Sequence, residues 1–322
     1  MTENNLGNTQ YFRTKPDQEL EVKEVLDLVY NAMDEKGYNP VNQIVGYIMS
    51  GDPTYITSHK GARSMIMKVE RDELVEELLN EYAELVEETA KFMYDFADYN
   101  PESDRYELRG VIPAQETLRA SETINPPFEL SQWHCVMSMA QLWRERLGKE
   151  RNPEWDDLLD KLSPLASKDG LYLAAETAPQ TYEDIRFTSD HPAVLGAVGI
   201  FPHSRLVDPA IMKQTQEWIW DKWNWEKTWG WDYPMVSMNA TRLGERENAV
   251  AALLMSKRTN TCLKNGHNFQ DARLRCYLPG NGGLLTAVAL MCAGWDGCNE
   301  KNPGFPKNGE WDVRWEGIKP LP

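Results

Sequence analysis

The stretch EKGYNPVNQIVGYIMSGDPTYI, residues 35–56, sets the helical plan of the N-terminal part of the chain. Gly37 stands where the end of a helix favours a left-handed residue. Asn39 and Pro40 then supply an N-cap and a first-turn proline for the next helix. Gly51-Asp52-Pro53 ends that second helix with turn-forming residues. These signals predict one helix that stops near Gly37 and a short apolar helix over residues 41–49.

Helical spacing of apolar residues continues on both sides of this stretch. From Leu20 to Met33 the apolar positions recur with the period of a helix, which predicts the first helix. Residues 62–100 contain no glycine or proline and predict a third, unbroken helix about 58 Å long at 1.5 Å per residue. Such long patterns favour a coiled coil or a helix shared between neighbours. Because three helices bury little apolar surface alone, we expect a homodimer or packing on the rest of the chain.

Residues 1–88 resemble the IreB family of regulatory phosphoproteins. The matching text comprises residues 35–47, 50–56, 62–63 and 70–74. The resemblance implies a small helical dimer without catalytic residues. It also implies a target of a membrane Ser/Thr kinase and its phosphatase, acting in cell-envelope stress and cephalosporin tolerance. Thr9, just before an aromatic residue, matches the family's acceptor threonine; an unmodified threonine is the alternative.

Composition separates this first part from the remainder. All 12 tryptophans and all 5 cysteines lie after residue 132. Residues 1–100 carry 9 Lys/Arg against 20 Asp/Glu, whereas the remaining residues carry 25 against 30. One hydrophobic core rarely changes composition so sharply, so we expect two domains, 1–88 and 85–322, joined through a long helix.

Charge and hydropathy exclude several classes of function. A pI near 4.8 argues against binding nucleic acid, which requires a basic surface. The longest apolar run, Leu284–Trp295, is shorter than the roughly 20 residues that span a bilayer, and residues 1–20 lack the apolar core of a secretion signal. An odd cysteine count without a CxxC pair favours reduced thiols and a cytoplasmic protein. An exported enzyme without its signal remains open.

The second part alternates helical patterns with turns rich in Pro, Gly and Asn. We expect an all-α arrangement with paired helices and functional loops at one end, as in an (α/α)6 toroid. No strand-like alternation of any length appears. The expected helices lie near residues 128–148, 153–162, 191–200, 208–222, 233–243, 246–256 and 283–293.

Tryptophans and carboxyl groups in this part favour carbohydrate chemistry. Six tryptophans fall within residues 218–231, among them Trp229 and Trp231, and each indole N–H needs a partner when it is buried. Glu116 follows a rigid Pro turn, and a carboxyl group held against apolar groups can stay protonated as a general acid. Asp232 is the first choice for the second carboxylate of a glycosidase and Asp190 the second. Capping or salt-bridged surface roles, and ordinary packing of the indoles, are the alternatives.

Several motifs in shared order resemble six-hairpin (α/α)6 glycosidases. They are residues 190–202, 230–231 with 240–244, 279–283, 303–306 and 313–317. The nearest comparison is the α-L-fucosidase-type inverting branch, followed by the disaccharide phosphorylases. The resemblance implies Glu116 as general acid, Asn281 orienting water or substrate, and His191 binding sugar. Pro279 stands where that branch places its general-base Asp, so Asp232 is a candidate relocated base, and His267 is a further candidate for the sugar cleft.

The resemblance is incomplete, because the usual upstream β-sandwich and the first hairpins are missing from the matching region. The expected fold is therefore a three-helix N-terminal domain joined to an incomplete toroid. The expected function combines a regulatory phosphoprotein with a glycosidase-like domain that acts on an oligosaccharide or glycoside and is inverting if active. A working glycosidase or phosphorylase with an accessory domain, and a gene chimera with an inactive enzyme part, stay open. We find no cofactor motif and no metal-ligand spacing.

Overall fold

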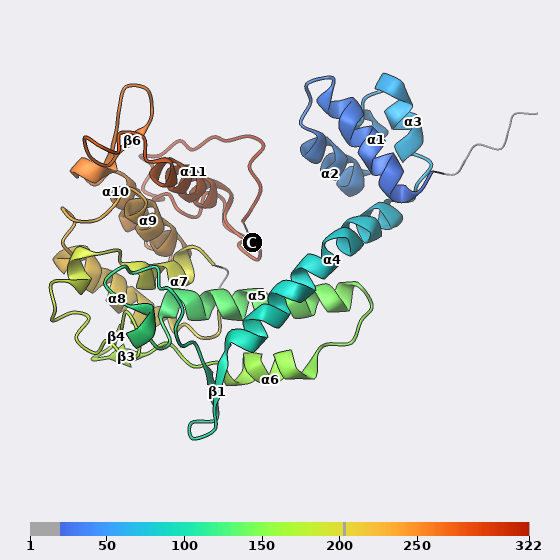
Figure 1. The fold of residues 1–322 in the computed structure, drawn as a ribbon. Helices are drawn as coiled ribbons and strands as arrows, with labels where there is room; N and C mark the ends of the chain where they lie inside the picture. Colours follow the sequence, from blue (N-terminus) through green and yellow to red (C-terminus); the bar gives the residue numbers. More distant parts are fainter. Residues whose placement is uncertain (1–19, 202–203, 322) are drawn as a thin grey trace, which may run out of the picture. The chain divides into compact units, whose positions relative to one another are not determined.

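The computed structural model describes residues 20–201 and 204–321, and these residues are predominantly helical (Figure 1). Contacts between residues divide the chain into two compact units, which we call unit 1, Met1–Leu85, and unit 2, Val86–Pro322. The expectation of a mainly helical protein is confirmed at this level. Helix α4, Arg71–Phe96, contains the boundary between the units.

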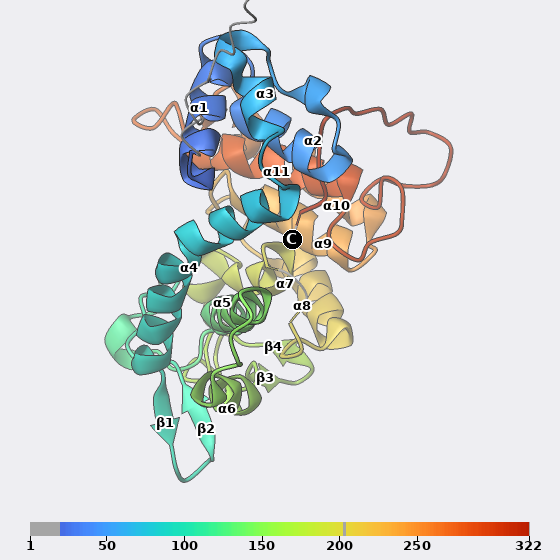
Figure 2. The ribbon, with the colours of Figure 1, turned by 90° about the vertical axis from the view of Figure 1, so that its right-hand side faces the viewer.

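Unit 1 consists of short helices around a small apolar core (Figure 2). Its elements are α1 Val22–Asp34, α2 Pro40–Ser50, η1 Pro53–Tyr55, η2 His59–Gly61, α3 Ala62–Ile66 and the first part of α4. The buried residues of this core come from the α-helices and from the loop at Ile56. They are Val25, Leu26, Val29, Ala32, Met33, Ile44, Tyr47, Ile56, Ala62, Ile66 and Leu74.

The turn signals around α2 act as the sequence predicts. The Asn39 side chain accepts a hydrogen bond from the Asn42 amide at 3.1 Å, and Pro40 occupies the first turn. Gly37 and Gly51 both adopt the left-handed conformation, with φ values of 75° and 71°. A side chain at Gly51 would be strained in this conformation. The predicted boundaries of α2 are therefore confirmed to within one residue.

The prediction of one unbroken helix from residue 62 to residue 100 is wrong. Helix α3 ends at Ile66, and α4 begins at Arg71. The Glu73 side chain accepts a hydrogen bond from the Glu70 amide at 3.1 Å, so it caps the start of a new helix. The absence of Gly and Pro did not reveal this break because a capping side chain, rather than a helix-breaking residue, defines it.

Unit 2 contains most of the chain, and its described residues form three short antiparallel strand pairs, β1–β2, β3–β4 and β5–β6. Each strand is only two or three residues long, too short for an alternating pattern to appear in the sequence. After α4 its elements are β1 Asp98–Asn100, β2 Arg105–Glu107, η3 Ala120–Glu122, α5 Pro127–Arg146, α6 Pro153–Lys161, β3 Ser167–Lys168, β4 Leu171–Tyr172, η4 Phe187–Ser189, η5 Ala193–Leu195, α7 Gly196–Gly199, α8 Pro209–Lys222, α9 Asp232–Arg242, α10 Arg246–Leu253, η6 Arg258–Asn260, β5 Thr261–Cys262, β6 Asn268–Phe269 and α11 Leu278–Ala293.

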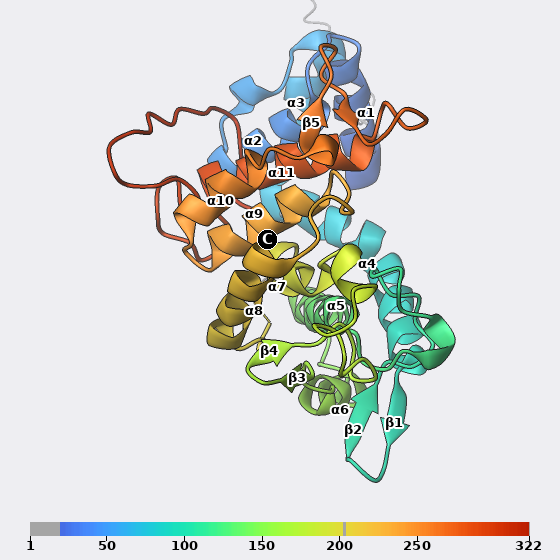
Figure 3. The same cartoon turned by 90° about the vertical axis from the view of Figure 1, so that its left-hand side faces the viewer.

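Helix α9 lies at the centre of one half of unit 2, where it packs against α7, α10 and α11 (Figure 3). Residues 232–241 are all buried, so both the polar and the apolar side chains of this helix lie in the interior of unit 2. Helices α5 and α6 pack together in the other half, and the Trp133 indole donates a hydrogen bond to the Met93 carbonyl of α4 at 2.9 Å. These packings do not establish a toroid.

Three expected helices differ from the structure by three or more residues at one end. The helix expected over 246–256 ends at Leu253. Only Gly196–Gly199 of the expected helix 191–200 is α-helical, because His191 and Pro192 lie in a loop before the 3₁₀ turn η5. Helix α11 begins at Leu278 rather than near residue 283, with Pro279 in its first turn. Pro279–Gly283, one of the motifs that resemble the six-hairpin glycosidases, is therefore part of a helix.

None of the helices in the described residues combines the length and the apolar character needed to span a bilayer.

Candidate functional site

Glu116 lies at the end of a loop that is held by two buried polar side chains. The Ala114 amide donates a hydrogen bond to the Glu129 carboxylate at 2.6 Å, and the Gln115 side chain donates to the Phe187 carbonyl at 3.1 Å. Burial raises the pKa of Glu129, although the Ala114 amide opposes this shift. Glu116 itself is exposed, so the expectation that apolar groups surround its carboxyl group is wrong. Its neighbour Gln115 occupies the buried position instead.

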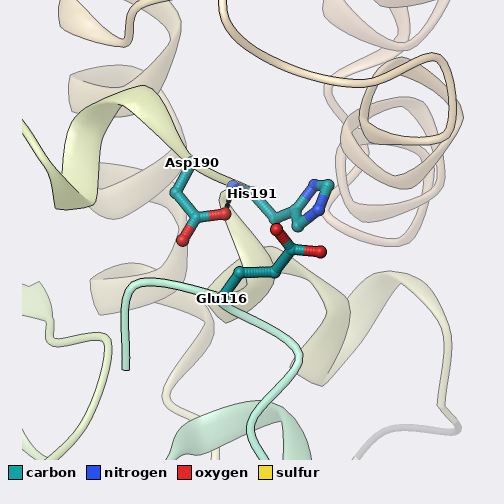
Figure 4. Close-up of side chains that lie close together, drawn as sticks. All are labelled: Glu116, Asp190 and His191. Atoms are coloured by element: carbon teal, nitrogen blue, oxygen red, sulfur yellow. Dashed lines mark hydrogen bonds between the residues drawn. The ribbon is translucent and has the colours of Figure 1, made fainter. Parts of the chain in front are cut away.

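Asp190 connects the loop at Glu116 to the segment that carries His191 through hydrogen bonds (Figure 4). One Asp190 carboxylate oxygen accepts hydrogen bonds from the Thr117 amide at 2.5 Å and from the Thr117 hydroxyl at 2.6 Å. The other oxygen accepts from the His191 amide at 2.6 Å. Asp190 therefore positions residues 116–117 and His191 next to each other, and Figure 4 shows the Glu116 carboxylate beside the imidazole ring.

His191 and Asp232 form a buried pair at the start of α9. The His191 Nδ1 lies 3.0 Å and 3.1 Å from the two Asp232 carboxylate oxygens, and the Trp229 amide donates to one of these oxygens at 2.7 Å. The exposed fractions of the side chains are 5% for His191 and 0% for Asp232. Both oxygens of Asp232 are thus engaged inside the protein. In the structure its carboxylate contacts the His191 ring, and its role as general base stays a prediction.

Burial and charge act in opposite directions on this pair. Burial disfavours the protonated imidazole, but the hydrogen bond to Asp232 and its negative charge outweigh burial, so the pKa of His191 is raised. Burial also raises the pKa of Asp232, and the hydrogen bond from His191 opposes that shift. Nδ1 also lies 3.2 Å from the Trp231 indole Nε1, which can only donate. The closer Asp232 carboxylate can only accept, so we assign the proton to Nδ1, which leaves Nε2 as the atom of His191 that can exchange a proton with a ligand.

Aromatic rings flank the His191–Asp232 pair. The centroids of the Trp231 and Trp229 rings lie 4.9 Å and 6.1 Å from that of His191, and Tyr277 lies 5.4 Å from Trp229. Burial raises the pKa of Tyr277 to about 12, with smaller contributions from the charges of Asp232 and Glu116. Tyr277 was not predicted, because no motif around it points to this site.

The tryptophan-rich segment thus divides into structural and site residues. The indole N–H of buried Trp223 donates to the Asp190 carbonyl at 2.8 Å, and that of buried Trp225 donates to the Trp220 carbonyl at 3.1 Å. These buried rings pack in the core and support the segments that carry the site. Trp229 and Trp231 are only partly buried, which leaves ring surface for a ligand.

Asn281, in α11, and His267, in the β5–β6 hairpin, lie beside this cluster rather than in it. The Asn281 side chain accepts a hydrogen bond from the Asn268 amide at 2.9 Å and donates to the Gly266 carbonyl at 2.8 Å. The His267 ring lies 3.2 Å from the Asn265 amide group. The hairpin meets the tryptophan loop where Gln270 accepts a hydrogen bond from the Gly230 amide at 3.0 Å. Asn281 is therefore placed to hold the hairpin that supports Trp229 and Trp231.

Glu116, Asp190 and His191 are also the residues in this site that could ligate a metal ion. One potential ligand atom from each lies within 4.8 Å of the others. No motif indicated this cluster, because Glu116 and the His191 segment are far apart in the chain. Asp190, however, already accepts three hydrogen bonds, and Asp232 engages Nδ1 of His191. Among the described residues, no hydrogen bond engages the Glu116 carboxylate or His191 Nε2, and a carboxyl group beside an imidazole is a pair suited to proton transfer.

In unit 1, residues that carry the resemblance have structural roles. A side chain at Gly46 would overlap the Tyr55 ring, so only glycine allows the two segments to pack this closely. The Asp52 side chain accepts a hydrogen bond from the Thr54 amide at 2.9 Å, and the Arg63 side chain donates to the Ile56 carbonyl at 2.8 Å. The turn at 50–56 is thus fixed by the residues of the motif.

A comparison with protein families matches residues 7–84 to the model described as IreB regulatory phosphoprotein. A UPF0297 protein of Lachnoclostridium phytofermentans is 69% identical over 77 residues, which cover 24% of this chain and 88% of that protein. The chain belongs to the IreB family. UPF0297 proteins of Ruminiclostridium cellulolyticum and Acetivibrio thermocellus are 54% and 60% identical over 79 and 78 residues, covering 24% of this chain and 90% and 87% of those proteins.

The IreB match confirms the family resemblance of the N-terminal part of the chain only. It ends at residue 84, so it covers residues of unit 1 and leaves the glycosidase resemblance of unit 2 as a hypothesis. Thr9, the expected phosphorylation site, lies within the IreB match but outside the described residues.

Proposed function

We propose that the chain combines an IreB regulatory module, controlled by phosphorylation at Thr9, with a second unit that performs acid–base chemistry on an oligosaccharide or glycoside. The observation that carries the second part is the exposed Glu116 carboxylate beside the buried His191–Asp232 pair. Cleavage of an acetal bond requires a general acid and a general base for the attacking water, and in this proposal the imidazole takes the place of the second carboxylate that most glycosidases use. The partly buried Trp229 and Trp231 add apolar ring surface for the C–H face of a sugar.

Each residue has a defined part in the proposed reaction. A bound sugar shields the exposed Glu116 carboxyl group from water, which favours its protonated form. Glu116 then donates its proton to the oxygen of the leaving sugar as the glycosidic bond breaks. His191 Nε2 accepts a proton from the water that attacks the anomeric carbon, and Asp232 stabilises the resulting imidazolium through Nδ1. Asp190 is a positioning residue, because its oxygens hold Thr117 and the His191 amide. The imidazolium then releases its proton and Glu116 takes one up, which restores the starting state after both products leave.

The spacing of the two proton-transfer groups bears on stereochemistry. Ligand atoms of Glu116 and His191 lie within 4.8 Å of each other, whereas the carboxyl groups of inverting glycosidases are about 6.5–9.5 Å apart to admit water. Inversion therefore requires the exposed Glu116 side chain to swing away when a sugar enters. The anomer released first, followed by ¹H NMR, distinguishes inversion from retention.

A toroidal arrangement of unit 2 is part of the same proposal. It is supported by the packing of α5 on α6 and of α9 on α7, α10 and α11, with Asp232 at one end of α9. Phosphorolysis is the alternative reaction, in which phosphate replaces the attacking water. Cleavage that depends on added phosphate would identify it.

Glu116→Gln tests the enzymatic proposal directly. A panel of aryl glycosides and disaccharides is assayed with the full chain, and the substitution is expected to reduce turnover by about 100-fold or more, the contribution of a general acid. Substrates with good leaving groups should lose less, because they need less protonation. Thr117→Ser keeps the hydroxyl that contacts Asp190 and serves as a matched control. Activity that is unchanged in the Gln variant rejects the assignment, and no activity on any substrate favours a chain with only a working regulatory module.

Phosphorylation of Thr9 is tested separately. Phosphate would add up to two negative charges to an acidic module, so we expect it to act by repulsion or through an arginine-bearing partner. The full chain is incubated with a PASTA-type kinase and ATP, and its intact mass is measured before and after treatment with the cognate phosphatase. A gain of one phosphate that disappears in Thr9→Ala is expected. A gain that persists in this variant places the modification elsewhere.

A further inference from the structure

A cavity in unit 2 lies at the opposite end of α9 from the His191–Asp232 pair. It has a volume of 520 Å³ and is lined by Val198, Pro209, Ala210, Lys213, Arg242, Leu243 and Trp295. Asp232 and Arg242 are the first and last residues of α9, which places them about 15 Å apart along the axis at 1.5 Å per residue. Ligand pockets typically enclose about 300–1,000 Å³, so this cavity is large enough for a sugar-sized molecule.

The charged side chains of the cavity wall are cationic, in a chain whose net charge is −16. Arg242 lies over the Trp295 ring at 5.2 Å, so the indole covers one face of the guanidinium group and fixes its plane. Burial lowers the pKa of Arg242 to about 10, and the guanidinium group therefore stays charged at neutral pH. Lys213 is at the rim, with a half-exposed side chain whose Nζ lies 2.5 Å from Glu245.

The remaining wall of the cavity is apolar. Val198, Pro209, Ala210 and Leu243 come from α7, from the start of α8 and from the residue after α9. A planar guanidinium group held on a ring suits the bidentate recognition of phosphate oxygens, and a nearby ammonium adds charge for a dianion. The volume exceeds that of a bare ion, and the apolar wall suits the C–H surface of an attached organic group.

We propose that this cavity binds a small phosphomonoester, such as a phosphorylated monosaccharide, with its phosphate on Arg242 and its organic part against the apolar wall. Lys213 contributes charge at the entrance and leaves Glu245 in part when the ligand is bound. The proposal does not rest on the glycosidase assignment, because no residue of the Glu116–His191 site lines the cavity.

Titration calorimetry on the full chain with glucose 6-phosphate, glucose, inorganic phosphate and glucuronate tests the proposal. Glucose 6-phosphate is expected to bind at least tenfold more tightly than each of the other three. Equal binding of glucose rejects the anion site, equal binding of phosphate rejects the role of the apolar wall, and equal binding of glucuronate rejects the preference for phosphate. No heat with any of the four overturns the proposal.

Variants then place the binding site. Arg242→Lys, which keeps the charge but loses the planar fork, should weaken glucose 6-phosphate binding at least tenfold. Ala210→Phe fills the cavity from an exposed position on α8 and should abolish binding without replacing Arg242, which keeps the test decisive if the Arg242 variant fails to fold. Lys222→Gln is the matched control, because Lys222 lies over the Trp218 ring at 5.6 Å outside the cavity. Binding that survives both cavity variants, or that is lost in Glu116→Gln, contradicts the assignment.

Discussion

The two units have hydrophobic cores of different size and composition. Unit 1 has one small apolar cluster, from Val25 to Leu74, and its motif residues fix turns and caps. Unit 2 has a larger core and tolerates buried polar groups within it, including Asp232, His191 and Gln115. A small core leaves little stability in reserve for buried charge, whereas a larger one can support a reactive pair. The difference fits the proposed division, with regulation in unit 1 and chemistry in unit 2.

The largest effect is expected from Asp232→Asn. This change leaves His191 without its negative partner and favours the wrong tautomer, so glycosidase turnover should fall about 10⁴-fold. Breaking a buried ion pair costs about 3–5 kcal/mol, and unit 2 should therefore unfold at lower temperature. Calorimetry and the glycoside assay measure both effects. If Asp190→Asn lost as much activity and stability as Asp232→Asn, the two carboxylates would be equivalent. That result would contradict the separate roles proposed for Asp232 and Asp190.

In unit 1, Ile56→Ala is expected to remove about 2–5 kcal/mol, because Ile56 is fully buried and its loss leaves a cavity. With so small a core, this change should unfold most of unit 1. Helicity by circular dichroism should fall, while turnover by unit 2 stays at its original value. An equal fall in turnover would contradict the independence of the two units.

Acid should act on unit 2 through His134. Burial, followed by the charge of Arg205, lowers the pKa of His134 to about 4. Between pH 6.5 and about 4, His134 is protonated in the unfolded chain but neutral in the folded one, so protons favour unfolding in this range. The contribution of the neutral, buried His134 to the free energy of unfolding is therefore present above pH 6.5 and is lost as the pH falls towards 4. After allowance for partial exposure, the loss is about 1–2 kcal/mol. Urea unfolding at about pH 7 and about pH 4.5 should show a smaller difference in His134→Gln, and an unchanged difference would reject the effect.

Local signals in the sequence predicted much of unit 1 because they act over a few residues. The Asn39–Pro40 start of α2 and the glycine turns at Gly37 and Gly51 follow from the backbone preferences of those residues. The break between α3 and α4 was missed, because it depends on a single Glu73 side chain. The family resemblance itself rested on the same local motifs.

The candidate site in unit 2 was predictable only in its parts. Glu116, Asp190 and Asp232 could be named from local chemistry and His191 from the family resemblance, and the structure brings the four together. Their roles could not be assigned, because the burial of Asp232 depends on helices distant in sequence. Tyr277 and Glu129 escaped notice for the same reason: their contacts at this site are long-range.

The smallest prediction compares the same chemical change in both units. Asn39 caps α2 in unit 1 through the Asn42 amide, and Asn152 caps α6 in unit 2 through the Glu154 amide at 2.9 Å. Replacing either residue by Ala should cost about 1 kcal/mol of unfolding free energy, because one helix-terminal amide loses its acceptor. The expected loss of unfolding free energy is similar in the two units, but the total stability from which it is subtracted differs.

Because unit 1 has the smaller core, the same loss should lower its melting temperature more than that of unit 2. Smaller domains shift by about 4–8 °C for each kcal/mol, and domains of about 150–250 residues shift by about 2–4 °C. Differential scanning calorimetry of the full chain should show two unfolding transitions. The one that Ile56→Ala removes or lowers belongs to unit 1, so a single experiment gives the shift of each unit. Asn39→Asp and Asn152→Asp keep a capping oxygen and should restore most of each transition. Equal shifts in the two Ala variants would mean that the units unfold together, and the contrast between the small core of unit 1 and the larger core of unit 2 would then have no thermodynamic basis.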